Sequence, residues 1–297
     1  MIADEISRLK EERNAVVLAH NYQVPAVQDV ADFVGDSLEL AIRAKNTDAD
    51  VIVLCGVDFM AETAQILNPA KTVLLPAGEA TCPLAQALTP DMIRDARSVH
   101  PDAAVVVYVN STAECKAEAD ITCTSANAVD VVRSLDEDVV FVGPDANLAS
   151  YVRGQVPEKT ILPLPADGHC PVHQRFTLAD VEAGRVQGDA VVCHPECSPE
   201  VQAASDIVAS TGGMMRQAHL HPQWTVLTEE AMTYRLGRTF PDAVFHAVKG
   251  MECADMKMTT AEDVLMALKY GQHRVTVDES VAAGARRAIE RMIALKR

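Results

Sequence analysis

The chain has 297 residues, 48% of them hydrophobic, and a formal net charge of −16. This hydrophobic content excludes a disordered chain and suits buried parallel strands, while the acidity excludes general nucleic-acid binding, which needs a cationic face. The longest apolar runs, such as residues 104–109, are too short to span a membrane, and the first residues lack the order of a signal peptide. We therefore expect a cytoplasmic protein without nucleic-acid or membrane partners, whose eight cysteines are thiols or metal ligands rather than disulfides.

A threefold internal repeat organises the chain. Strand-like segments at residues 15–19, 104–107 and 190–193 open its three thirds, and a polar triplet follows each one at offsets of 88 and 86 residues. The triplets are His20-Asn21-Tyr22, Tyr108-Val109-Asn110 and His194-Pro195-Glu196. The same offsets align Asp32 with Asp120 and Asp206, and Ser37 with Ser125 and Thr211.

The second half of each third repeats more loosely. Strands are predicted at residues 51–54, 139–142 and 224–227, followed by helical stretches near residues 59–67, 147–152 and 229–238. A further strand, at residues 72–75, 160–164 and 243–247, then leads to Cys82, Cys170 and Cys253. Strands that alternate with helices indicate βαβ units with parallel sheets.

Any α/β chain has some βα periodicity, but recurrence of hydroxyls, triplets and cysteines at nearly one offset favours a true repeat. A period near 85 residues is too long for a common solenoid. We therefore predict an α/β fold of three similar αβα domains with parallel sheets around a pseudo-threefold axis. The predicted repeats cover residues 1–85, 86–172 and 173–257, and a helical tail, residues 258–297, packs on them.

The polar triplets stand where ligands bind in parallel α/β sheets, beyond the carboxyl ends of the strands. His20 and His194 occupy equivalent strand ends, and imidazoles serve as acids or bases near neutral pH. The alternative for a single histidine is an ordinary core or surface residue. The predicted catalytic residues are His20, Tyr22, Tyr108, His194 and Glu196. The predicted substrate-binding residues are His20, Ser37, Tyr108, Asn110, Ser125, His194, Glu196 and Thr211.

Ser37, Ser125 and Thr211 each precede a predicted helix. Each is therefore interpretable as an N-cap, as part of an anion site, or as both.

Cys82, Cys170 and Cys253 are the cysteines that recur in all three repeats. Three converging thiolates suit either a zinc ion or a cubane iron–sulfur cluster, and the alternative is three buried thiols. A four-iron cluster with three ligands would leave one iron free to bind substrate. The other cysteines are interpreted as structural: Cys55, Cys115, Cys123, Cys193 and Cys197. The histidines outside the triplets carry weaker signals, and His173 is the best of them because it follows Cys170 by three residues.

With these residues in hand, the chain resembles the quinolinate synthase family over nearly its whole length. The motifs are residues 18–22 (LAHNY), 62–76 (ETAQILNPAKTVLLP), 108–116 (YVNSTAECK), 124–127 (TSAN), 168–173 (GHCPVH), 194–197 (HPEC) and 253–257 (CADMK). The resemblance implies three α/β domains around a [4Fe–4S] cluster held by the three recurring cysteines, with one open iron. It implies condensation of iminoaspartate with dihydroxyacetone phosphate to quinolinate, with loss of phosphate and two waters, in NAD biosynthesis.

The resemblance also places the residues named above around the active site. The sequence leaves open whether an L-aspartate oxidase hands over the unstable imine in a transient contact. Other functions also stay open: an aconitase-like iron–sulfur hydro-lyase, an iron–sulfur redox sensor or electron carrier, and a zinc hydrolase. The wide spacing of the three cysteines counts against the electron carrier, which usually has four, often closely spaced.

Overall fold

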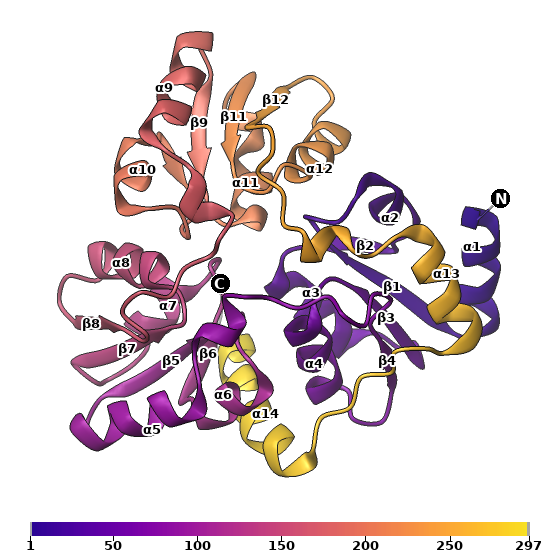
Figure 1. The fold of residues 1–297 in the computed structure, drawn as a ribbon, viewed down its shortest axis with the longest axis horizontal. Coiled ribbons are helices and arrows are strands. Elements are labelled where there is room, and N and C mark those ends of the chain that lie inside the picture. The colour runs from indigo at the N-terminus through magenta and orange to yellow at the C-terminus, as the bar shows by residue number, and fades with distance from the viewer. Residues whose placement is uncertain (1, 296–297) are drawn as a thin grey trace.

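Three lobes surround a common centre in the computed structural model, which describes residues 2–295 (Figure 1). Each lobe contains one four-stranded sheet in which every strand pair is parallel. Helices flank the sheets, so the fold class predicted from the sequence is confirmed.

The elements follow one another in the same order in each repeat. The first repeat contains α1 (Ile2–Glu12), β1 (Ala15–His20), α2 (Pro25–Val30), β2 (Phe33–Gly35), α3 (Ser37–Asn46), β3 (Val51–Cys55), α4 (Asp58–Leu67) and β4 (Thr72–Leu74). The second contains α5 (Pro90–Val99), β5 (Ala104–Tyr108), α6 (Ala113–Glu118), β6 (Ile121–Cys123), α7 (Ala128–Arg133), β7 (Val139–Gly143), α8 (Ala146–Gln155) and β8 (Thr160–Pro163). The third contains α9 (Leu178–Gln187), β9 (Ala190–Cys193), α10 (Pro199–Ala204), β10 (Ile207–Val208), α11 (Thr211–Gln217), β11 (Gln223–Leu227), α12 (Met232–Thr239) and β12 (Val244–Ala247). The chain ends with α13 (Ala261–Tyr270) and α14 (Glu279–Ala294), and the 3₁₀ helices are η1 (Ala85–Ala87), η2 (His173–Arg175), η3 (Ala218–Leu220) and η4 (Asp255–Lys257).

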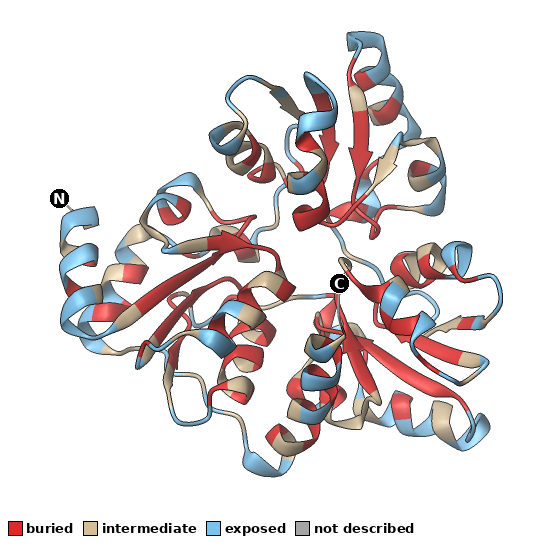
Figure 2. Cartoon of the chain, turned by 180° about the vertical axis from the view of Figure 1, so that it is seen from behind, coloured by how far each residue is buried: buried red, intermediate tan, exposed pale blue. Residues whose placement is uncertain are grey.

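The first long strand of each repeat lies inside its sheet. The strand orders are β2-β1-β3-β4, β6-β5-β7-β8 and β10-β9-β11-β12. The register is the same each time, with Leu18 opposite Phe33, Val106 opposite Ile121, and Val192 opposite Ile207. Because neighbouring strands cover both edges and helices cover the faces, β1, β5 and β9 are almost entirely buried (Figure 2).

The short strands β2, β6 and β10 are absent from the sequence prediction, which treated each as part of a loop. They contain only two or three residues, too few for a periodic pattern. The aligned aspartates hold them in place instead. Asp32, Asp120 and Asp206 each accept a hydrogen bond from a backbone N–H of the neighbouring central strand, at 2.7–2.8 Å. The backbone N–H of each aspartate donates back to the same strand residue. The repeated Asp therefore holds the start of each short strand against the central strand of its sheet.

The last two helices pack on the first and second repeats. Helix α13 lies against α1 and α2, and α14 lies against α6, β6 and α4. Arg286 in α14 donates a hydrogen bond to the carbonyl of Ile66 at the end of α4 (2.8 Å). The domain boundaries stay a prediction. The predicted helical tail, residues 258–297, extends in part beyond the described residues, and α14 ends at Ala294.

Helix α12 begins at Met232, three residues later than predicted. The carboxylate of Glu229 accepts the N–H of Ala231 at 3.0 Å, so residues 228–230 form a turn before the helix. Within residues 2–295, no helix combines the length and the apolar character that a membrane crossing requires.

Candidate functional site

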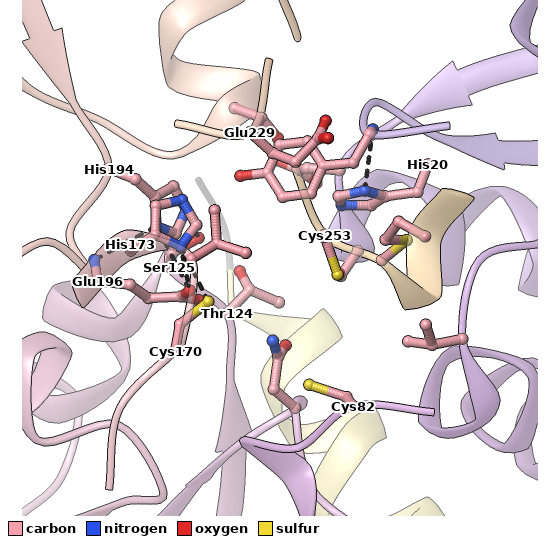
Figure 3. Close-up of a pocket in the computed structure, with 18 of the residues that line it drawn as sticks. His20, Cys82, Thr124, Ser125, Cys170, His173, His194, Glu196, Glu229 and Cys253 are labelled. Atoms are coloured by element: carbon pink, nitrogen blue, oxygen red, sulfur yellow. Dashed lines mark hydrogen bonds and ion pairs between the residues drawn. The ribbon is translucent and has the colours of Figure 1, made fainter. Parts of the chain in front are cut away.

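A cavity lies at the centre, where the three repeats meet. Each repeat contributes the residues that follow its strands, so side chains far apart in the sequence point into one space (Figure 3). All twelve candidate residues line it: His20, Tyr22, Ser37, Cys82, Tyr108, Asn110, Ser125, Cys170, His194, Glu196, Thr211 and Cys253. The structure thus brings the candidates together, while their individual roles stay predictions.

His20 and His194 have the same tautomer for the same reason. Nδ1 of His20 accepts the backbone N–H of Tyr22 (3.2 Å), and Nδ1 of His194 accepts that of Glu196 (3.3 Å). Since Nδ1 accepts in both rings, the proton of a neutral ring is on Nε2. Burial lowers the pKa of each imidazole to about 3, against a partly opposing effect of Glu196. Both rings are therefore neutral hydrogen-bond donors near pH 7.

A chain of hydrogen bonds connects the two tyrosines through all three repeats. The Tyr22 hydroxyl lies 2.5 Å from Thr228 Oγ1, which lies 2.8 Å from Nε2 of His173. Nδ1 of His173 lies 2.8 Å from Oε2 of Glu196, and the Tyr108 hydroxyl donates to Oε1 at 2.5 Å. Each neighbour in this chain can pass a proton to the next, so the arrangement can relay protons across the cavity.

Glu196 is the acidic centre of this chain and is 3% exposed. Burial alone favours the neutral acid, but His194, His173 and the Tyr108 hydroxyl stabilise the carboxylate, so the pKa of Glu196 lies below its ordinary value. Burial and the Glu196 charge raise the pKa of Tyr108 well above 10, so its hydroxyl remains a donor. Glu196 is thus an ionised acceptor with two fixed donors.

The hydroxyls at 37, 125 and 211 are not N-caps, which corrects one interpretation of the sequence. The cap of α3 is Asp36, that of α11 is Ser210, and Asn127 occupies the cap position of α7. In α3 and α11 the preceding residue has the extended backbone that a cap requires, so Ser37 and Thr211 begin their helices. Thr211 Oγ1 accepts from Asn21, and Ser125 Oγ lies 3.1 Å from Nε2 of His194. These hydroxyls therefore face the cavity instead of capping their helices.

The three recurring cysteines have a common local structure. Each sulfur accepts backbone N–H groups from the residues two and three positions later, where a 3₁₀ turn begins. Such donors stabilise a thiolate, yet burial is the larger effect and raises the pKa of Cys82 to about 12, with the pKa values of Cys170 and Cys253 also raised. Burial thus favours the protonated thiols, and a metal ion that binds them would displace the proton.

The remaining cysteines lack this arrangement. Burial raises the pKa values of Cys55 and Cys123, and no backbone donor offsets it. Cys193 and Cys197 lie in the apolar core of the third repeat, and Cys115 donates to the Leu88 carbonyl. Their positions fit the structural role predicted for them.

The three recurring thiols fit a cluster better than a single ion. Ligands of one zinc ion lie within ~4 Å of one another, because Zn–S bonds are about 2.3 Å. Within residues 2–295, one group of three metal-ligating side chains has its ligand atoms within 4.8 Å of one another. It consists of Cys170, His173 and Glu196. Cys82 and Cys253 are outside that group. Thiols that line one cavity at wider spacing fit an iron–sulfur cluster, in which each sulfur binds a different iron.

Several residues at the site were missed by the sequence analysis. Thr228 and Glu229 follow β11 directly, and Asp145 follows β7, so the strand-end argument applied to β1, β5 and β9 could have found them. Asp145 accepts the N–H of Cys170 at 3.1 Å, and Glu229 accepts that of Cys253. Lys257 forms an ion pair with Glu229 at 2.6 Å. Together they hold the cysteine loops against the strand ends.

Comparison with known proteins agrees with this geometry. Residues 4–294 match the family model described as "Quinolinate synthetase A protein". The chain is 56% identical to the quinolinate synthase of Thermococcus onnurineus over 97% of this chain and 96% of that protein. It is 50% identical to that of Methanothermobacter thermautotrophicus over 97% and 96%, and 46% identical to that of Thermotoga maritima over 99% of both. The family expected from the motifs is confirmed: the chain is an enzyme of the quinolinate synthetase A family.

Proposed function

We propose that this enzyme condenses iminoaspartate with dihydroxyacetone phosphate to quinolinate, releasing one phosphate and two waters, as a step of NAD biosynthesis in the cytoplasm. The observation that carries the proposal is the meeting of three thiols, one from each repeat, with two neutral imidazoles and an ionised glutamate in one cavity. The cysteines would hold a [4Fe–4S] cluster whose fourth iron lacks a protein ligand. When bound, that iron would supply a Lewis acid for substrate oxygen or nitrogen.

The two substrates carry two carboxylates and a phosphate, yet the described residues that line the cavity include no lysine or arginine. Their charge must therefore be met by hydrogen bonds. We assign Ser37, Ser125 and Thr211 to the carboxylate and phosphate groups, with Asn110 and the Nε2–H groups of His20 and His194 as further donors. Holding both anions in one closed space removes most of the entropic barrier to their condensation.

Loss of water requires a base for the proton next to the departing hydroxyl. Glu196 is suited to this, because it is ionised and its second oxygen is held by Tyr108. The Nε2–H group of His194 is the donor at the same end of the cavity. Tyr22 and Tyr108, at the two ends of the hydrogen-bond chain, would orient the substrates or relay the proton.

The test is quinolinate formation from dihydroxyacetone phosphate and freshly generated iminoaspartate, under anaerobic conditions, with reconstituted protein. We expect product that disappears in air and in Cys170→Ala, while Cys123→Ala, a buried cysteine outside the site, keeps both iron and activity. No product from a chain that carries about four irons would reject the proposal. A panel of small hydroxy acids would then test the hydro-lyase alternative.

The source of the imine is a separate question. A transient contact with an L-aspartate oxidase remains a prediction. Faster product formation when the oxidase is added at the same imine concentration would support such a contact.

A further inference from the structure

Cys170, His173 and Glu196 form a compact group at one wall of the cavity (Figure 3). Nδ1 of His173 lies 3.2 Å from the Cys170 sulfur and 2.8 Å from Oε2 of Glu196, and all three ligand atoms lie within 4.8 Å of one another. The side chains of His173 and Glu196 are 2% and 4% exposed. A sulfur, a nitrogen and an oxygen at these separations match the ligand set of a tetrahedral divalent ion with one position open.

The atoms around the group already orient each ligand. Thr228 Oγ1 lies 2.8 Å from Nε2 of His173, the nitrogen that does not face the other two ligands. The Tyr108 hydroxyl holds Oε1 of Glu196, so Oε2 is the oxygen left for an ion. Backbone N–H groups of Val172 and His173 donate to the Cys170 sulfur. Metal ligands in proteins are held by such partners, which fix the tautomer of the histidine and the rotamer of the carboxylate.

Nδ1 of His173 faces both Oε2 of Glu196, at 2.8 Å, and the Cys170 sulfur, at 3.2 Å. Thr228 Oγ1 can accept a hydrogen bond from Nε2 of His173, and in that tautomer the Nδ1 lone pair is directed at the space between the other two ligand atoms. We propose that the cluster-free chain binds one divalent ion of the zinc type through Cys170 Sγ, His173 Nδ1 and Glu196 Oε2. Binding displaces the thiol proton, the ring proton of His173 is then on Nε2, and a cavity water completes the coordination.

This ion and the iron–sulfur cluster exclude each other. The statement rests on the proposed function, because Cys170 is one of the three proposed cluster ligands. Cys82 and Cys253 do not belong to the compact group, so they remain free thiols while the single ion is bound. Zinc loaded first therefore blocks cluster assembly.

The experiment is a Co²⁺ titration of the full-length, cluster-free chain under anaerobic conditions. Tetrahedral Co²⁺ absorbs visibly, and a sulfur-to-cobalt band counts the thiolates bound. We expect one Co²⁺ per chain with a single thiolate, displaced by Zn²⁺. Affinity should fall about 100-fold or more in Cys170→Ala and His173→Gln, and about 10-fold in Thr228→Val, which keeps all three ligands.

Two matched variants distinguish this site from metal binding at a neighbouring histidine or cysteine. His194 stacks on His173 with ring centroids 4.5 Å apart, but its Nδ1 is already occupied by the Glu196 N–H. His194→Gln and Cys82→Ala should therefore keep Co²⁺ binding. Unchanged binding in Cys170→Ala, no band in the unaltered chain, or loss of the band in Cys82→Ala would each overturn the proposal. A chain that binds Co²⁺ as described but forms no quinolinate would leave this site standing and reject only the proposed function.

Discussion

Glu196 is held by residues from other parts of the chain more than by its own loop. Tyr108 from the second repeat fixes one oxygen, and His173, between the second and third repeats, meets the other. The two donors keep the side chain ionised although it is almost completely buried. An ionised and oriented carboxylate can accept a proton from a substrate held against it, and its lowered pKa limits its strength as a base.

Replacing Glu196 with Gln removes the base but keeps the shape of the side chain. We expect turnover to fall by a factor of about 10²–10⁴, with iron content and the visible spectrum of the reconstituted protein unchanged. The measurement is the steady-state rate of quinolinate formation beside iron analysis. Glu200→Gln, on the exposed face of α10, is the control and should keep full activity. An active Glu196→Gln enzyme would remove Glu196 from the proton-transfer role.

The buried histidines predict how stability depends on pH. The folded chain does not protonate His20 or His194 until about pH 3, whereas the unfolded chain protonates them near pH 6.5. The unfolded state thus binds more protons between these values, so stability falls as pH falls from 6.5 toward 3. Each histidine accounts for about 2 kcal/mol of the loss between pH 7 and pH 5.

Urea unfolding of the cluster-free chain at pH 7 and pH 5 measures this loss. The free energy of unfolding is lower at pH 5 than at pH 7, and in His20→Gln this difference should shrink by about 2 kcal/mol. The exposed His219, changed to Gln, serves as the control. If the free energy of unfolding changes equally between pH 7 and pH 5 in His20→Gln and in the unaltered chain, His20 is protonated in the folded state at pH 5.

At the scale of elements, the helices α3 and α11 meet at the edge of the cavity. Asp36, the cap of α3, lies so close to α11 that a Cβ on Gly212 would overlap its carboxylate. Asn21 donates to Thr211 beside this contact, at 3.0 Å. The first and third repeats therefore touch at a position where any side chain would displace the Asp36 carboxylate.

Alanine is normally favoured over glycine inside a helix by about 1 kcal/mol. We expect the opposite at this position: Gly212→Ala should destabilise the chain by about 1–2 kcal/mol, because the overlap costs more than the gain in propensity. Gly237→Ala in α12 has no heavy atom within 4 Å of the added carbon and should stabilise the chain. Urea unfolding of the two variants should give changes in the free energy of unfolding that have opposite signs. If both variants are stabilised, α11 shifts away from Asp36 at no cost.

The sequence predicted the long elements and missed the short ones. The nine strands of four or more predicted residues follow from apolar runs, and their repeat follows from the aligned triplets. Strands β2, β6 and β10 depend on a single side chain each, such as Asp32, which no periodic pattern reveals. Glu229 was assigned to a helix, because the turn before Met232 is stabilised by the Glu229 side chain itself and leaves no pattern in the sequence.

For the whole molecule, the repeat explains why the site residues meet but not how far apart they lie. Equivalence under a threefold arrangement brings Cys82, Cys170 and Cys253 to one cavity, as expected from their spacing. It does not reveal that His173 and Glu196 approach Cys170 while the other two cysteines lie outside this group. That asymmetry comes from the loops after β8 and β9, which contain His173 and Glu196 and differ in sequence from their counterparts in the other repeats.

The closing helix α14 connects two of the three repeats. Its Gly284 packs on Ala117 of α6, with the backbone and Cβ of Ala117 only 3.0–3.1 Å from where a Cβ would lie. On the same helix, Arg286 reaches the Ile66 carbonyl of the first repeat. A larger side chain at Gly284 must push α14 away from α6 and loosen both contacts.

We therefore expect Gly284→Leu to lower the free energy of unfolding by about 1–3 kcal/mol. Iron uptake during reconstitution should fall with it, because Cys82 and Cys170 belong to the two repeats that α14 connects. Arg287→Leu, on the exposed face of the same helix, is the matched control and should change neither quantity. Thermal unfolding and iron analysis measure both effects. If Gly284→Leu is as stable as the control, α14 covers the first two repeats without holding them together. The cavity is then kept in shape by contacts at its own rim, such as that between Asp36 and α11.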